Sequence, residues 1–233
     1  MKDKNINKAT RYIIFRDREV TINTILFSLL ALAYLLSLYK FLLSVKGENF
    51  VILMTYALIL GIGVIASNTI TINLSVKEKL TGRLEFLLAT GFEIKEIIKV
   101  YTLENWRISS IASYIIFFGT LMICDLGKIF IFAYLSTISL HYCVVLTFNI
   151  LAMYRKNFKF FKNIIFFSTS LLIYLFGVFS EKILVFLERL NLDVNIFIIN
   201  INLFATILLL AYSFFEFRKM NNESVMEVKS EWS

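Results

Sequence analysis

Apolar residues fall in long runs separated by short charged stretches, and this alternation predicts a membrane protein. The runs are about 20 residues long, which a helix needs to cross about 30 Å of hydrocarbon. Six spans are predicted, at about 22–45, 50–74, 108–124, 129–153, 164–180 and 196–217. We therefore expect an all-α integral membrane protein in which residues 1–233 form a single transmembrane domain.

Basic residues are concentrated in every second connection. Six Lys and Arg precede the first span, six lie between spans two and three, four lie between spans four and five, and three follow span six. The other three connections hold four in all, and Lys40 lies within a span. Because cytoplasmic loops are enriched in Lys and Arg, this pattern places both termini in the cytoplasm.

The composition agrees with this interpretation. Hydrophobic residues make up 58% of the 233 residues and charged residues only 18%, whereas about a quarter of a typical soluble domain is charged. The loop bias accounts for the net charge of +7, so we expect a lipid bilayer and no nucleic acid as the partner. Residues 1–19 are polar and charged, and we expect no cleaved signal peptide there. The expected location is the cell (plasma) membrane.

Two amphipathic segments outside the spans favour short surface helices. Residues 1–20 carry an apolar patch among arginines, which favours an interfacial helix on the cytoplasmic side; a polar tail leading into the first span is the alternative. Residues 181–193 show a similar pattern on the other side and favour a short outer helix between spans five and six. Residues 218–233 form a cytoplasmic tail.

The longest connection, residues 75–107, carries two amphipathic runs. Leucines and then isoleucines recur at helical spacing, and Gly82 and Gly91 are the natural breaks. This pattern favours a helix–break–helix segment held against the cytoplasmic surface. Such a segment suits partner docking, and an inert surface helix is the alternative.

The sequence contains no pattern typical of a catalytic or metal centre. It has no phosphate-binding loop, no nucleophile elbow and no zinc-protease motif. His141 is the only histidine, and Cys124 and Cys143 lack a CxxC spacing, so neither a metal site nor a disulfide framework is predicted. A functional role is the default hypothesis for an ionisable group in a membrane. For His141 we favour hydrogen bonding between helices instead.

Residues 78–90 read Glu-Lys-Leu-Thr-Gly-Arg-Leu-Glu-Phe-Leu-Leu-Ala-Thr. This run resembles the cytoplasmic motif of type-2 ATP-binding cassette (ABC) transporter permeases, with Gly91 where many members carry proline. The predicted six spans, the interfacial helix and the outer helix are also similar to that family. In the family this segment is the coupling helix, which seats in a groove of the ATPase subunit. The resemblance implies that the contact residues for a partner ATPase are Glu78, Thr81, Gly82, Arg83, Leu84, Glu85, Phe86, Leu87, Leu88, Ala89 and Thr90.

The resemblance implies the membrane-spanning permease subunit of an ABC exporter. The chain would move an amphipathic or hydrophobic substrate, such as a peptide toxin, a bacteriocin or a drug, out of the cell. It is not expected to be an enzyme or to bind a cofactor, because separate ABC ATPase subunits would bind ATP and Mg²⁺. It would act as a homodimer or as a heterodimer with a related permease.

A polar cluster in the inner part of span two is the candidate substrate path. Its members are Asn68, Thr69, Thr71 and Asn73, and hydrogen bonding between helices is the alternative role. The alternative for the whole chain is a non-transporting membrane immunity or scaffold protein that binds a cytoplasmic partner through its basic amphipathic loop. An intramembrane enzyme is disfavoured, because the spans hold no paired acids or nucleophile–base set.

Overall fold

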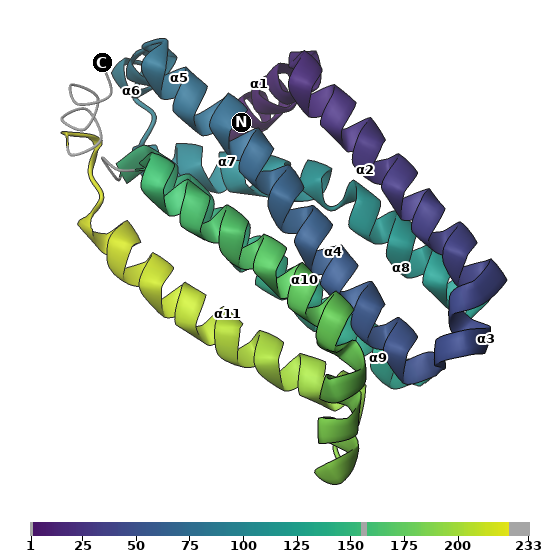
Figure 1. Cartoon of the computed structure of the whole chain (residues 1–233). Coiled ribbons are helices and arrows are strands. Elements are labelled where there is room, and N and C mark those ends of the chain that lie inside the picture. The colour runs from purple at the N-terminus through teal and green to yellow at the C-terminus, as the bar shows by residue number, and fades with distance from the viewer. Residues whose placement is uncertain (1, 155–157, 224–233) are drawn as a thin grey trace.

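The computed structural model describes residues 2–154 and 158–223, and all regular structure in this part is helical, as predicted. Figure 1 shows a helix bundle with α1, α5, α6 and α7 gathered at one end and α3 at the opposite end. The helices are α1 (Lys2–Arg16), α2 (Arg18–Ser37), α3 (Leu43–Lys46), α4 (Glu48–Thr71), α5 (Lys77–Leu80), α6 (Arg83–Ala89), α7 (Ile94–Ser109), α8 (Ile111–Ile123), α9 (Gly127–Tyr154), α10 (Phe158–Arg189) and α11 (Val194–Lys219). Two π-helical turns, η1 (Leu38–Leu42) and η2 (Ile72–Val76), join α2 to α3 and α4 to α5.

Four helical stretches are long and apolar enough to cross a membrane. They are Arg18–Lys46, Glu48–Leu80, Gly127–Met153 and Val194–Lys219, and they coincide with predicted spans one, two, four and six. The bent pair α7 and α8 makes a fifth if it is taken as one broken span. The described part of the chain therefore has the character of a multi-pass membrane protein with four or five candidate spans.

The predicted third span differs from these four. Helix α8 has 13 residues and is about 20 Å long, too short on its own for about 30 Å of hydrocarbon. It meets α7 at an angle of 43°. Any crossing here must therefore include part of the amphipathic helix α7.

Predicted span five, 164–180, lies in α10, but most of its side chains are outside those that the structure describes. The separate outer helix expected after residue 180 is instead the end of α10, which continues unbroken to Arg189. The reason is packing: Leu187 is buried, and Ile183 and Leu184 contact the same apolar cluster. The helix ends before Asn191, whose φ is +51°.

Helix α4 occupies the centre of the bundle. It packs against α7, α8, α9 and α10, and 78% of its most apolar stretch is buried inside the chain. The corresponding shares are 11% for the first candidate span and 22% for α11, so these helices expose apolar side chains outward. Exposed apolar surface of this extent suits lipid or another membrane subunit.

His141 of α9 lies against Gly63 of α4. The ring is 1% exposed, and its two nitrogens lie 3.3 Å from the hydroxyls of Ser109 and Ser110. A Cβ at position 63 would lie 2.9 Å from the His141 ring, so glycine allows this close approach. The geometry agrees with the interpretation of His141 as a hydrogen-bonding group between helices.

Candidate functional site

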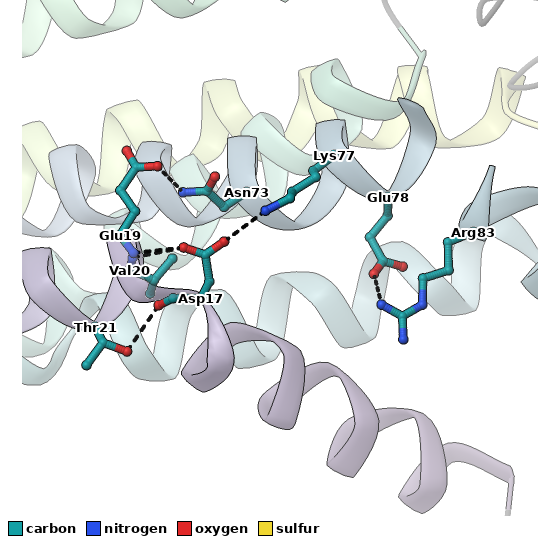
Figure 2. Close-up of polar contacts among 8 residues, drawn as sticks. All are labelled: Asp17, Glu19, Val20, Thr21, Asn73, Lys77, Glu78 and Arg83. Carbon is teal, nitrogen blue, oxygen red and sulfur yellow. Dashed lines mark hydrogen bonds and ion pairs between the residues drawn. The ribbon is translucent and has the colours of Figure 1, made fainter. Parts of the chain in front are cut away.

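The segment 75–107 folds back on itself at the predicted glycines. Gly82 separates α5 from α6 and has a φ of +74°, in the left-handed region that favours glycine. This turn brings Arg83 back toward the preceding helix, where its Nη1 donates to Oε1 of Glu78 at 3.1 Å (Figure 2). A second turn at Gly91, with a φ of +84°, leads into α7.

Glu78 joins three helices. It lies in α5, pairs with Arg83 of α6, and accepts a 2.9 Å hydrogen bond from the hydroxyl of Tyr101 in α7. Glu78 is only 4% exposed, and a buried carboxylate needs such partners to offset its lost hydration. Glu78, the first residue of the motif, therefore connects α5, α6 and α7 through its buried carboxylate.

Helix α5 is also fixed to the end of α9. Lys79 is 3% exposed, and its Nζ donates to the backbone carbonyl of Met153 at 2.8 Å. A cation near a helix C-terminus is favoured by the helix dipole. Just before α5, the hydroxyl of Ser75 donates to Oδ1 of Asn149 in α9 at 2.6 Å. These two contacts give the start of the segment a defined position on the bundle.

Helix α6 has one anchored face and one open face. Leu84 is 2% exposed, and Leu87 and Leu88 pack on the same buried cluster, as their spacing predicts. On the other face Phe86 is 67% exposed, Glu85 is partly buried, and the exposed residues beside them are Thr81, Arg83, Ala89 and Thr90. An exposed aromatic ring beside an arginine is typical of a protein contact surface.

Helix α1 is a separate helix, which distinguishes it from a simple tail leading into α2. Its Arg11 donates to both oxygens of Glu104 in α7, at 2.9 and 3.1 Å, and Arg107 donates to the same carboxylate. Asp17 caps the start of α2 and also accepts from Lys77 at 3.3 Å (Figure 2). Helix α1 is thereby tied to both ends of the segment.

The four substrate-path candidates of α4 and η2 have different surroundings. The Thr71 hydroxyl accepts from Nδ2 of Asn105 at 2.9 Å, and Nδ2 of Asn73 donates to Glu19 at 3.1 Å. These two contacts are the hydrogen bonding between helices that was the alternative. Thr69 donates to a carbonyl of its own helix, and Asn68 is 9% exposed. A substrate path through these residues stays a prediction.

The buried carboxylate of Glu104, which joins Arg11 and Arg107, was not predicted from the sequence. Glu104 is 1% exposed and falls three residues after Tyr101 and four before Ile108, on the apolar face of α7. A charge on an apolar helical face was the signal that could have found it. The capping role of Asp17 had a signal, because Asp directly before a helix is a favoured N-cap residue. Its pairing with Lys77 had none, because that contact depends on where α5 lies.

Among the described residues, no group of three or more His, Cys, Asp or Glu side chains could hold a metal ion. Comparison of the chain with protein-family models, curated proteins and solved structures gave no match. The geometry of the segment and its resemblance to a permease motif are therefore the two indications of function.

Proposed function

We propose that the chain is the membrane-spanning permease subunit of an ATP-driven ABC exporter, with both termini in the cytoplasm. The observation that carries the proposal is α6: a short helix between two glycine turns, anchored by Leu84, with Phe86 exposed. This is a suitable shape for receiving a push from a soluble partner, because a force on α6 reaches the bundle through buried contacts.

Two connections would carry that force. Glu78 links α6 to α5 and α7, and Lys79 links α5 to the end of α9. Since α4 continues through η2 into α5, movement of α6 would act on the central helix and on α9 together. Both are candidate spans, so the contacts support a route from an ATPase to the membrane domain.

Copurification with an ATPase tests the proposal. The tagged full chain is coexpressed with a candidate ABC ATPase subunit and purified in mild detergent. We expect a complex containing a protein with a phosphate-binding loop, and vanadate-sensitive ATP hydrolysis that depends on the chain. A chain that purifies without any ATPase, from cells that contain the candidate partner, would contradict the assignment.

Two substitutions in α6 separate docking from folding. Glu85→Lys should leave expression intact and lower ATPase binding and export, because a reversed charge repels its counterpart at a docking surface. Leu87→Asp should lower the yield of the chain itself, because it places a charge in the anchoring face. Lys99→Glu is the matched control, an exposed charge reversal on α7 outside the motif. If Glu85→Lys assembles and exports like the parent, α6 is only a surface helix.

The substrate class follows from the resemblance alone. We propose an amphipathic or hydrophobic substrate, such as a peptide toxin, a bacteriocin or a drug, moved between two facing permease chains. The alternative, a non-transporting immunity or scaffold protein, predicts a cytoplasmic partner that binds without ATP hydrolysis. Substrate-stimulated ATP hydrolysis in reconstituted vesicles distinguishes the two.

A further inference from the structure

An open pocket of about 360 Å³ lies between α1, the start of α2, and α5 with α6. Its volume is at the lower end of the range of small-molecule sites, about 300–1,000 Å³. The residues that matter for its chemistry are Tyr12, Arg16, Asp17, Lys77, Glu78 and Arg83. Figure 2 shows four of these side chains, with Asp17 directed at Lys77 and Glu78 directed at Arg83.

The two carboxylates of this pocket, Asp17 and Glu78, already accept hydrogen bonds from donors of the protein. Asp17 Oδ1 accepts from the backbone amides of Glu19 and Val20, and Oδ2 accepts from Lys77. Glu78 accepts from Arg83 and from a tyrosine hydroxyl of α7. Both carboxylates line the pocket, and each is paired with a cation of the same pocket.

The cations keep donors available. Arg16 is exposed, the Lys77 side chain is 63% exposed, and Arg83 uses one terminal nitrogen for its bond to Glu78. The charged residues that line the pocket are three cations and two carboxylates, a formal net charge of +1, and Glu19 lies outside this lining, on Asn73. One monoanionic phosphodiester would neutralise that charge through charge-assisted hydrogen bonds.

The location identifies the source of such a phosphodiester. Asp17 caps α2, which begins one candidate span, and Lys77 lies in the last turns of another, so the pocket is at a membrane end of the bundle. Tyr12 in the pocket lining is 65% exposed, and Phe15 on the same helix is 55% exposed. Exposed aromatic rings near cations are typical of the headgroup level of a bilayer.

We infer that this pocket binds the headgroup of an anionic phospholipid, with the phosphodiester held by Arg16, Lys77 and Arg83. The lipid would bridge α1 to α5 and α6, beside the Asp17–Lys77 pair. The site shares Arg83 with the proposed ATPase contact segment. Its test uses the chain without an ATPase, so failure of the lipid site and failure of the proposed transport function are distinguishable.

Lipid titration of the purified full chain in detergent tests the site. Phosphatidylglycerol should raise the unfolding temperature and remain bound in native mass spectrometry, whereas phosphatidylcholine should do neither. Arg16→Gln and Lys77→Gln should each weaken phosphatidylglycerol binding by about fivefold. Both side chains are exposed, so these variants should fold, and Lys77→Arg should retain binding.

Arg18→Gln is the matched control, because it removes the same charge two residues away and Arg18 does not line the pocket. Equal weakening by Arg18→Gln would overturn the site and indicate general attraction to a charged surface. Equal stabilisation by the two lipids would also overturn it. Soluble glycerol 3-phosphate is added as a competitor in the last experiment. If it displaces phosphatidylglycerol at millimolar concentration, the pocket is a site for free phosphate compounds and the lipid assignment is refuted.

Discussion

Replacing Tyr101 with Phe removes one hydrogen bond from the buried Glu78 carboxylate and keeps the ring in place. The two residues are 1% and 4% exposed, so water cannot easily replace the lost donor. A hydrogen bond to a charged group contributes about 1.5–3 kcal/mol. We expect Tyr101→Phe to lower the free energy of unfolding by about that amount.

The ion pair on the other side of Glu78 should matter less. The Arg83 side chain is 57% exposed, and exposed ion pairs contribute about 0.2–1 kcal/mol because water screens them. Arg83→Gln should therefore cost less than Tyr101→Phe, although both remove a partner of the same carboxylate. Tyr12→Phe is the surface control; Tyr12 is 65% exposed, and the change should stay within about 0.5 kcal/mol.

Equilibrium unfolding in mixed micelles, followed by circular dichroism, measures these differences. A double-mutant cycle with Glu78→Ala isolates the pairwise energy, and residues in one hydrogen-bond network couple by about 0.5–3 kcal/mol. If Tyr101→Phe costs no more than Tyr12→Phe, or if its cost is the same in the Glu78→Ala background, Glu78 does not organise the segment.

Three further changes test other contacts. Gly63→Ala should lower the free energy of unfolding by about 1–3 kcal/mol in micelles, because its Cβ would overlap the fixed His141 ring. Adding His141→Ala should remove most of that cost. If Gly63→Ala leaves the free energy of unfolding unchanged, the close packing of α4 on His141 is contradicted. Gly82→Ala should lower the free energy of unfolding by about 1–2 kcal/mol in the same assay, because an L-residue is strained at a φ of +74°. An unchanged free energy of unfolding would mean that position 82 does not adopt this left-handed turn. Lys46 lowers the pKa of the Glu181 carboxyl below its ordinary 4.5, so the pair stabilises the fold above that pH and loses its effect as pH falls through the lowered value. The unfolding temperature of Glu181→Gln should therefore lie below that of the parent at pH 7 and equal it in strong acid. The same difference in unfolding temperature at both pH values would show that the ion pair does not stabilise the fold.

The spans that could be predicted from the sequence are those whose apolar runs are uninterrupted. Candidate spans one, two, four and six coincide with apolar runs, because backbone hydrogen bonding in lipid leaves few alternatives to a helix. The glycine breaks at Gly82 and Gly91 were also predictable, since both adopt a positive φ. The extension of α10 to Arg189 was not, because it depends on packing of Leu187 against other helices.

The helix–break–helix form of the segment was predictable from the sequence, and its interactions were predictable only in part. The spacing of Leu84, Leu87 and Leu88 correctly assigned the anchored face of α6. The link from Glu78 to Tyr101 joins residues 23 apart, and the link from Arg11 to Glu104 joins residues 93 apart. Pairings of this kind depend on tertiary packing, which periodicity along one helix does not contain.

Photo-crosslinking at position 86 is the most direct test of the claim that α6 docks an ATPase. Phe86 is replaced by benzoylphenylalanine, which keeps an aromatic ring on the open face, and Phe118 of α8 receives the same replacement as a control with similar exposure, 58% against 67%. Irradiation of the membrane complex should attach the nucleotide-binding subunit at position 86 and not at position 118. Lack of a crosslink at 86 in an intact, ATP-hydrolysing complex, or equal crosslinking at both positions, would contradict the account.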